Sequence, residues 1–338
     1  MTRRWAFIGT GRVSRQMADA VGRAEGAQLH GVLSRRPETA AAFARDHGAT
    51  ATYASLEALL ADPEVDVVYV ASPNGLHREH VVAAAGAGKH VLCEKPMAND
   101  PGDCLAMITA CTRAGVRLGI GFQYRQHPAH RTVRELVARA ELGRPVFADA
   151  AVHVPRLATP GWYDDPSMAG GGVLPMAGVH RIDLLRFVLG AEVAEVSAFL
   201  GARDAGRPYE DTVAALLRFE DGIVATVRFA LDAASPGDGV AVSGESGWAR
   251  AERTTSQWWG ADGGELSWSG SGGSGAEAFA LQDLYVSQVT SFTAAVEGGG
   301  RFEADGVDGL RAAEVTTALR RSAETGAVVP VERAPVGP

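Results

Sequence analysis

Hydrophobic residues in the first third of the chain alternate between short apolar runs and stretches with helical spacing. Apolar runs predict strands over 5–8, 29–33, 65–71, 90–93 and 117–121. The run at 65–71, VDVVYVA, is nearly continuous, as expected for a strand buried on both faces. Repeats of three or four residues predict helices over 12–23, 38–47, 56–60, 77–87 and 103–114, with Ser55 as an N-cap. This alternation predicts a doubly wound parallel sheet.

Beyond residue 121 the pattern changes to one of strands with few helices between them. Strands are predicted over 147–154, 193–200, 212–219, 222–231 and 239–242, and helices over 284–296 and 310–324. Asp221-Gly222 marks a hairpin turn. We interpret the Ser/Gly-rich stretch 267–275 as a flexible surface loop and the tail after Val331 as loosely held. The chain is therefore predicted to be an α/β protein, with a Rossmann domain over 1–121 and an α+β domain over 122–338 built on a large, mostly antiparallel sheet.

Composition narrows the functional classes. The chain has 338 residues, enough for about two domains, and its 46% hydrophobic and 21% charged content is ordinary for a soluble protein with a core. A net charge of −8 argues against a nucleic-acid partner. No apolar stretch approaches the ~20 residues of a membrane span. The three cysteines have no metal-ligand or disulfide spacing, which predicts reduced thiols and a cytoplasmic location.

The segment WAFIGTGRVS at 5–14 places a glycine-rich turn between the first strand and the first helix. The first glycine permits a tight turn, and the second lets the backbone approach a pyrophosphate. The helix N-terminus then offers N–H groups and a partial positive charge to that group. Ser14 replaces the usual third glycine or alanine. The residues assigned to this dinucleotide site are Gly9, Thr10, Gly11, Arg12 and Val13.

The end of the second strand, Ser34-Arg35-Arg36, bears on the choice of cofactor. A site specific for NAD carries an acid near this position to hold the ribose hydroxyls. Here a hydroxyl and two guanidinium groups stand instead, and these suit a phosphate. We predict NADP(H) in preference to NAD(H). The alternative is that Arg35 and Arg36 only solvate a loop.

Polar residues also follow the strand at 65–71. The carboxyl end of this strand should line the cofactor crevice, so Ser72, Pro73, Asn74 and His77 are assigned to cofactor binding. His77 and His80 have i, i+3 spacing, but no third metal ligand is evident. We therefore predict no metal site and interpret the histidines as polar residues near the nicotinamide ribose.

Four segments together resemble the glucose-fructose oxidoreductase / inositol dehydrogenase (Gfo/Idh/MocA) family over nearly the whole chain. They are GTGRVS at 9–14, SPNGLH at 72–77, GKHVLCEKP at 88–96 and GGGVLPMAGVHRID at 170–183. The resemblance implies an NAD(P)-dependent oxidoreductase that moves a hydride between nicotinamide and a carbonyl or alcohol carbon of a sugar or sugar-like substrate. The predicted NADP preference favours reduction. It also implies that the C-terminal sheet is open and often forms the oligomer interface, hence a homodimer or homotetramer.

The resemblance also assigns roles to residues. Lys95 would lie beside the nicotinamide, at a cis Lys95–Pro96 bond, and polarise the substrate oxygen while His180 relays a proton. The alternative for Lys95 is a surface salt bridge with Glu94. Further assigned positions are Glu94, Gln123 and Arg125 at the cofactor and Trp162, Tyr163 and Met176, with Lys95 and His180, at the substrate. Trp162 and Tyr163 could form a wall over the substrate or belong to the core.

The sequence departs from the family at Met176, where an aspartate usually stands four residues before the histidine. Methionine cannot orient an imidazole or raise its pKa by charge pairing. Asp183 could share a helix face with His180, although that position is more often structural. Four hypotheses stay open: Lys95 and His180 suffice, the substrate supplies the missing polarity, the enzyme reduces another group such as an imine, or the chain binds nucleotide as a sensor or accessory subunit without efficient turnover.

Overall fold

The structure of the protein is a computed structural model that describes residues 2–155, 161–203, 209–234, 237–254, 263–280, 283–298 and 300–336. Contacts between residues divide the chain into two compact units. The first comprises Met1–Gln123, Asp283–Leu310 and Val336–Pro338, and the second Tyr124–Gln282 and Arg311–Pro335. A late segment of the sequence therefore belongs with the N-terminal unit. The domain boundary at residue 121 stays a prediction.

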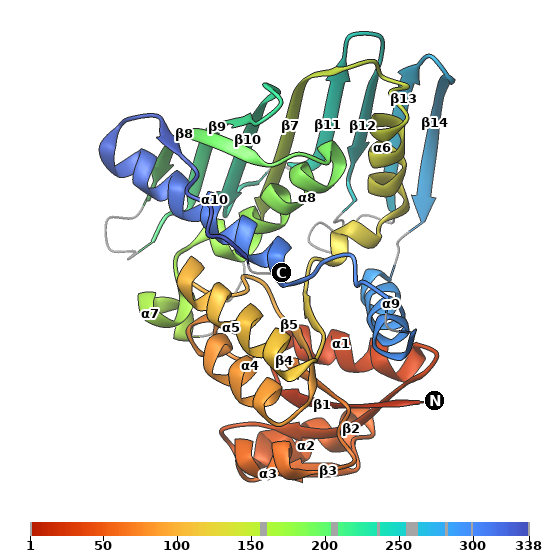
Figure 1. The fold of residues 1–338 in the computed structure, drawn as a ribbon, viewed down its shortest axis with the longest axis vertical. Helices are drawn as coiled ribbons and strands as arrows, with labels where there is room; N and C mark the ends of the chain where they lie inside the picture. The colour runs from red at the N-terminus through yellow and green to blue at the C-terminus, as the bar shows by residue number, and fades with distance from the viewer. Residues whose placement is uncertain are drawn as a thin grey trace. The chain divides into compact units, whose positions relative to one another are not determined.

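The first unit is built on a parallel sheet of strand order β3-β2-β1-β4-β5-β6 (Figure 1). Its strands are β1 (Arg3–Ile8), β2 (Ala27–Leu33), β3 (Ala51–Tyr53), β4 (Val67–Val70), β5 (His90–Cys93) and β6 (Leu118–Ile120). Its helices are α1 (Arg12–Arg23), α2 (Pro37–His47), α3 (Leu56–Ala61), η1 (Asn74–Leu76), α4 (His77–Gly86), α5 (Pro101–Ala114) and α9 (Leu284–Gly298). The predicted doubly wound parallel sheet is confirmed.

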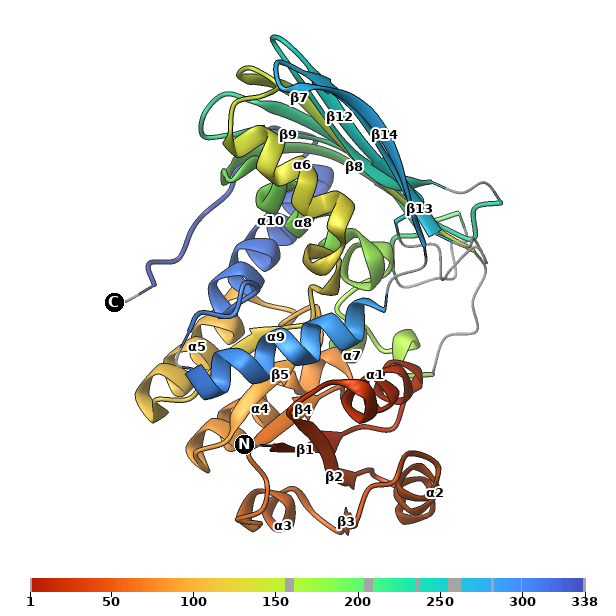
Figure 2. The same cartoon turned by 90° about the vertical axis from the view of Figure 1, so that its right-hand side faces the viewer.

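Burial explains this layered arrangement. All four residues of β4 are buried, which agrees with its continuous apolar sequence. Helices α1, α2 and α9 pack together on one side of the sheet, whereas α3, α4 and α5 pack together on the other (Figure 2). Ser55 caps α3 as predicted, because its side chain accepts a hydrogen bond of 3.2 Å from the Ala58 N–H. The strand order reverses between β1 and β4, and their carboxyl ends are where a doubly wound sheet binds ligands.

The second unit contains a larger sheet of order β14-β13-β12-β11-β7-β10-β9-β8-β15, in which β7 and β10 pair in parallel and the other paired strands are antiparallel. Its strands are β7 (Pro145–Val154), β8 (Val193–Gly201), β9 (Thr212–Phe219), β10 (Val224–Leu231), β11 (Asp238–Gly244), β12 (Trp248–Glu252), β13 (Gly263–Gly270), β14 (Gly273–Ala280) and β15 (Val329–Pro330). The remaining elements are η2 (Gln123–Gln126), α6 (Pro128–Ala138), η3 (Gly161–Asp164), α7 (Pro166–Ala169), η4 (Leu174–Gly178), α8 (Val179–Leu189) and α10 (Gly306–Thr325).

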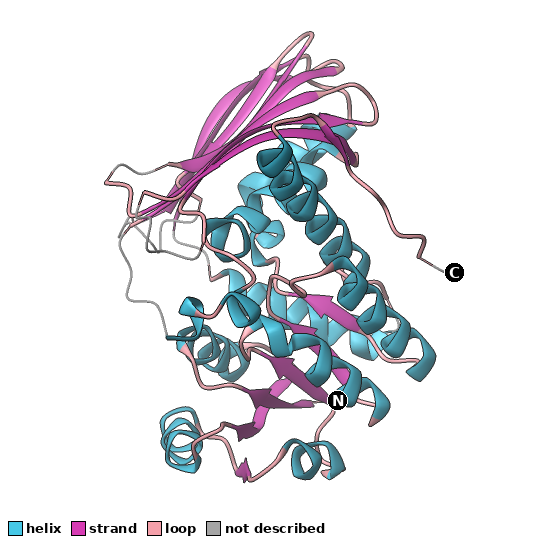
Figure 3. Ribbon diagram, turned by 90° about the vertical axis from the view of Figure 1, so that its left-hand side faces the viewer, coloured by secondary structure: helices cyan, strands magenta, loops and turns pink. Residues whose placement is uncertain are grey.

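One face of this sheet carries the helices. Helix α8 packs on β7 and β11, and α6 packs on β12 and β13. Figure 3 shows helices against one face of this sheet. Buried residues alternate with exposed ones along β9, as expected for a sheet that is covered on one face. On the other face Leu216 and Trp248 are exposed, and Phe199 keeps 82% of its accessible surface. The predicted mostly antiparallel sheet with helices on one face is confirmed.

The predicted flexible loop over 267–275 is wrong. This stretch contains the turn of a β hairpin in which β13 pairs with β14, Trp268 lying opposite Gly275. A Cβ atom at Gly275 would stand 2.6 Å from the Trp268 ring, so the glycine leaves room for an aromatic side chain across the strand pair. Serine and glycine here belong to paired strands at the edge of the sheet.

The chain after Val331 is also held more firmly than predicted. The Ala334 N–H donates to the buried Glu314 carboxylate at 2.7 Å, and Arg311 donates to the Ala334 carbonyl at 3.2 Å. These bonds fix residues that adopt no regular structure. The expectation of a loose tail is corrected as far as Ala334.

Candidate active site

The turn after β1 has the features that a pyrophosphate requires. Gly9 has φ +112°, and a Cβ there would lie 2.5 Å from the Ala71 carbonyl oxygen, so only glycine fits between β1 and β4. Gly11 differs, because its φ is −71° and a Cβ would meet no atom within 4 Å. Packing within the chain therefore does not require glycine at position 11. A glycine here is instead what a pyrophosphate needs, because the missing side chain lets the ligand approach the backbone. The N-terminus of α1 has no side-chain cap and no acid in its first turn, which leaves it suited to an anion.

A chain of hydroxyl groups joins this turn to the end of β2. Thr39 donates to the Arg36 carbonyl at 2.7 Å, and its Oγ1 lies 2.7 Å from Ser34 Oγ, which lies 3.3 Å from Thr10 Oγ1. Because each hydroxyl donates once, Ser34 donates to Thr39 and Thr10 donates to Ser34. Arg35 and Arg36 are exposed beside them. The structure thus brings the predicted residues Thr10 and Ser34 together at one edge of the sheet.

The His77 side chain bridges two loops at the carboxyl ends of β4 and β5. The side chain is fully buried, with Nε2 3.0 Å from the Ser72 carbonyl oxygen and Nδ1 2.9 Å from the Pro96 carbonyl oxygen. Burial lowers the pKa of His77 to about 4, although both carbonyl oxygens favour the charged ring. The contacts link the loop after β4, which carries Pro73 and the buried Asn74, to the loop after β5. His80 bonds to Ser72 Oγ at 2.9 Å instead.

Lys95 follows β5 and is partly exposed, and the Lys95–Pro96 bond is cis, as expected. Burial lowers the pKa of Lys95 to about 8, while the Glu94 carboxylate raises it and the Arg12 guanidinium lowers it further. An ammonium group in this state is charged at neutral pH and can release its proton just above it. This combination suits a group that stabilises charge on a reacting oxygen.

The late segment of the chain adds a residue that sequence reasoning missed. Tyr285 of α9 accepts a hydrogen bond of 3.3 Å from the buried Gln123 side chain in the same unit. The 284–296 pattern predicted the helix, but no sequence signal assigned it to the N-terminal unit. Its packing against α1 and β2 explains the assignment.

In the second unit His180 lies in the first turn of α8 and is 6% exposed. Its ring lies 4.5 Å from the Tyr124 ring, centroid to centroid, and the Arg181 guanidinium lies 5.3 Å from the same ring. Met176 occupies the π-helical turn η4 one turn earlier, where it packs partly buried against the apolar core. The Met176 side chain therefore contributes to the packing of the apolar core, one helical turn before His180 in the chain.

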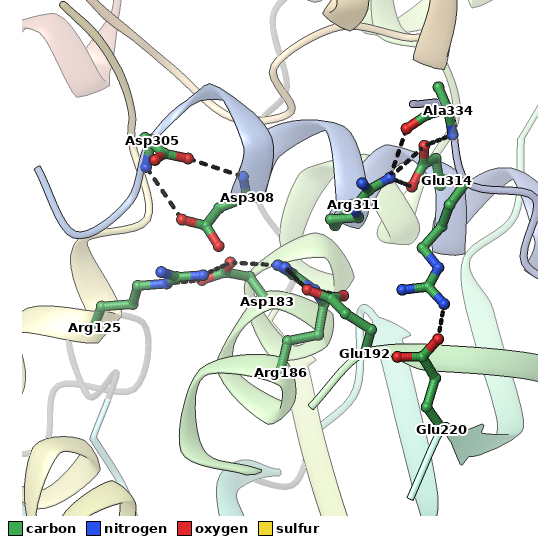
Figure 4. A network of polar contacts seen from close by, with 11 residues as sticks. Arg125, Asp183, Arg186, Glu192, Glu220, Asp305, Asp308, Arg311, Glu314 and Ala334 are labelled. Carbon is green, nitrogen blue, oxygen red and sulfur yellow. Dashed lines mark hydrogen bonds and ion pairs between the residues drawn. The ribbon is translucent and has the colours of Figure 1, made fainter. Parts of the chain in front are cut away.

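Asp183 is bound by arginines (Figure 4). Arg125 donates to its carboxylate through Nε at 2.8 Å and Nη2 at 2.5 Å, and Arg186 Nη1 lies 3.4 Å away. Arg186 also forms two bonds of 2.7 Å with Glu192. These contacts favour the structural interpretation of Asp183 over a role as the partner of His180. The cofactor role of Arg125 stays a prediction.

Trp162 and Tyr163 form a stacked pair in η3. Their ring centroids are 4.0 Å apart with an interplanar angle of 26°, and neither residue is buried. The pair is therefore a partly exposed aromatic surface of the second unit rather than part of its core. Aromatic faces of this kind pack well on the C–H faces of sugars.

A parallel doubly wound sheet with a glycine turn that suits a pyrophosphate is the fold of a dinucleotide-binding domain. The comparisons agree. Residues 3–122 match the oxidoreductase family with an NAD-binding Rossmann fold, and residues 130–250 match the GFO/IDH/MocA C-terminal domain. The chain belongs to the Gfo/Idh/MocA family of NAD(P)-dependent oxidoreductases.

The names of several similar proteins refer to sugar substrates. The chain is 34% identical over 332 residues to the 1,5-anhydro-D-fructose reductase of Ensifer adhaerens, covering 97% of this chain and 98% of that one. It is 32% identical to a D-xylose 1-dehydrogenase (NADP(+)) of Haloferax volcanii, over 89% and 91% of the two chains. The aldose-aldose oxidoreductase of Caulobacter crescentus, solved with glycerol, superposes with a TM-score of 0.88 at 27% identity, over 98% and 100%.

Clusters of metal ligands and membrane-spanning helices are both absent from the part of the chain that the structure describes. No group of three or more His, Cys, Asp or Glu side chains there could hold a metal ion. Among the helices that the structure describes, none combines the length and the apolar character needed to cross a bilayer.

Proposed function

We propose that this protein is an NADPH-dependent reductase of a carbonyl group in a sugar or sugar-like molecule, with Lys95 and His180 as its catalytic residues. One observation carries the proposal. Within the first unit, the open glycine turn follows β1 and Lys95 follows β5, and both therefore stand at the carboxyl edge of one parallel sheet. The nicotinamide supplies a hydride when bound.

The chain's own residues would then manage charge and proton. The Lys95 ammonium stabilises negative charge that develops on the carbonyl oxygen, which is where catalysis gains most. His180 gives that oxygen a proton, the general-acid role that a positioned imidazole can fill. Trp162 and Tyr163 would offer their stacked rings to the substrate.

The cofactor preference rests on Ser34, Arg35 and Arg36. The hydroxyl chain fixes Ser34, and the exposed guanidinium groups are free of a buried structural role. We expect the double variant Arg35→Ala/Arg36→Ala to lose at least about 100-fold in affinity for NADPH and little for NADH, because charged hydrogen bonds to phosphate contribute about 1.5–3 kcal/mol each. Fluorescence titration with both nucleotides measures this change.

Arg113→Ala is the matched control. Arg113 is exposed in the last turn of α5, the helix that leads into β6, and so lies toward the amino ends of the strands, away from the glycine turn. It should bind both nucleotides as the parent does. Equal affinity of the parent for NADPH and NADH would remove the arginine argument while leaving the reductase proposal intact.

The reductase proposal is tested by following NADPH oxidation with a panel of ketoses, aldoses and anhydro-sugars. Turnover of at least one sugar carbonyl, with polyols oxidised more slowly by NADP+, is the expected result. Tight NADPH binding without transfer to any sugar in the panel would contradict it.

Met176 gives a specific reason to keep a second function in view, that of a nucleotide-binding member with altered or lost sugar activity. Met176→Asp separates the two. Under our proposal this variant gains little sugar-reducing activity. The Met176 side chain packs against the apolar core, and burial there would raise the pKa of an aspartate in its place and favour the neutral acid. A large gain in sugar reduction would favour the second function.

The buried cysteines bear on the location of the protein, and the exposed face of the large sheet bears on its assembly. Cys93, Cys104 and Cys111 are buried thiols, which fits a reducing compartment, and we propose a cytoplasmic enzyme. The sheet face that bears the exposed Phe199, Leu216 and Trp248 also carries exposed arginines, Arg218 and Arg250 among them. We propose that this mixed face is covered in a homodimer or homotetramer.

A further inference from the structure

A buried carboxylate precedes Lys95 in the chain. Glu94 is 7% exposed at the end of β5, and both of its carboxylate oxygens are engaged. The Tyr69 hydroxyl donates to Oε1 at 2.7 Å, and the Lys95 backbone N–H donates to Oε2 at 3.2 Å. Tyr69 belongs to the neighbouring strand β4 and is fully buried. The carboxylate is thus held by two adjacent strands.

The chain also leaves room for this carboxylate. A Cβ atom at Gly121 would lie 3.0–3.2 Å from the carboxyl atoms of Glu94. The Gly121 N–H donates to the Cys93 carbonyl at 2.8 Å, so this backbone is fixed beside the end of β5. A larger residue at 121 would have to displace either the carboxylate or the strand pairing.

Glu94 and Lys95 each favour the charged form of the other. Burial raises the pKa of Glu94, whereas the Lys95 charge and the Tyr69 hydroxyl lower it. Burial, together with Glu94, Tyr285 and Cys93, raises the pKa of Tyr69 well above its usual value, so the tyrosine keeps its proton and always donates. On Lys95 the charged groups that act are Glu94, which raises its pKa, and Arg12, which lowers it.

We propose that Tyr69 is a positioning residue for Lys95: its hydroxyl holds the buried Glu94 carboxylate in its charged form, as the counter-charge that keeps the lysine protonated. Removal of the hydroxyl leaves a buried carboxylate with one donor fewer, which favours the neutral acid. Lys95 then loses its counter-charge and releases its proton more easily. The importance of this effect for turnover rests on the proposed function, but the effect on Lys95 does not.

A purely structural role for Tyr69 predicts something else. Its ring packs 4.8 Å from the Phe7 ring in the core of the sheet. Tyr69→Phe keeps that ring and removes only the hydroxyl. If packing were its whole contribution, this variant would leave the titration of Lys95 unchanged.

The sequence offers a direct measurement, because it contains only two lysines, Lys89 and Lys95. Protein grown with [13Cε]lysine gives two side-chain signals, and the Lys95 signal is the one lost in Lys95→Met. Lys89 is an internal reference for folding, since its ammonium donates to the Asp62 and Val65 carbonyls at 2.8 and 2.9 Å. The titration of Lys95 is then followed by NMR in the full-length protein without any substrate.

We expect the Lys95 signal to titrate near pH 8 in the parent. In Glu94→Gln the midpoint should fall by about one pH unit or more, as for loss of a close opposite charge. In Tyr69→Phe it should fall by a smaller amount. In the double variant it should equal that of Glu94→Gln, because the hydroxyl acts only through the carboxylate.

Two results would overturn the inference: an unchanged Lys95 midpoint in Tyr69→Phe with the Lys89 signal in place, or an undiminished effect of Tyr69→Phe in the Glu94→Gln background. Turnover gives a separate readout. The alkaline limb of the pH profile of kcat should move to lower pH in Tyr69→Phe, with the NADPH Kd unchanged. If the protein has no reductase activity, the pH profile of kcat cannot be measured and the proposed function fails. The NMR titration of Lys95 still tests the role of Tyr69 in that case.

Discussion

Lys95→Met is expected to lower kcat for carbonyl reduction about 1,000-fold while the NADPH Kd changes by no more than about threefold. The ammonium group acts on charge that exists mainly in the transition state, and such groups are worth about 100- to 10,000-fold. The fold should lose little stability: Glu94 loses a counter-charge but keeps its bonds to the Tyr69 hydroxyl and the Lys95 N–H, and the neutral side chain avoids the desolvation that lowers the pKa of this lysine to about 8. Steady-state kinetics and a nucleotide titration on the same preparation provide the comparison.

Lys89→Met is the matched control, since it changes the only other lysine. Its ammonium group satisfies two backbone carbonyls, so the variant should lose stability and keep kcat at temperatures where it stays folded. The catalytic role of Lys95 would be abandoned if Lys95→Met kept more than about a tenth of the parent kcat, since one general acid–base or electrostatic group contributes at least about 100-fold.

Asp183→Asn is expected to destabilise the protein by about 3–5 kcal/mol, the typical effect of removing one partner from a buried ion pair. Arg125 and Arg186 are 4% and 6% exposed, and both contact this carboxylate. The amide keeps one acceptor oxygen but removes the negative charge that Arg125 and Arg186 share, while Arg186 keeps its two bonds to Glu192. Urea unfolding followed by fluorescence measures the change.

Glu192→Gln tests the outer end of the same network. Its carboxylate side chain is 30% exposed, so water can take over part of its role, and the loss should be about 1 kcal/mol. Near-normal stability of Asp183→Asn, together with a shifted acid limb in the pH profile of kcat, would instead support the alternative in which Asp183 serves His180.

The N-terminal half could be predicted closely from the sequence. The helix predicted over 12–23 and the strand over 90–93 have the bounds of α1 and β5. In this half, apolar runs alternate with stretches of 3.6-residue periodicity, so local signals and burial agree. The glycine turn was predicted in the same way, because the ends of parallel strands are visible in the sequence. The role of Lys95 came from the family resemblance and stays a prediction.

The second half was less predictable for identifiable reasons. Helix α8 was missed because all its residues, Val179 to Leu189, are buried, so it has no polar face to reveal a helical period. Helix α6 had a usable signal that was overlooked, with His127 as N-cap and Pro128 at its first position. The β13–β14 hairpin was hidden by its serine and glycine content, which normally marks a loop.

The sequence by itself determined the class of protein, the nucleotide-binding edge of the first sheet and the identity of the lysine, since each depends on residues that are neighbours in the chain. Only the tertiary structure decided which distant groups act on them. The placement of α9 with the N-terminal unit, the arginines around Asp183 and the Tyr69 hydroxyl on Glu94 all join residues on different elements. Such contacts depend on how elements pack, and packing is a property of three-dimensional burial that no local spacing records.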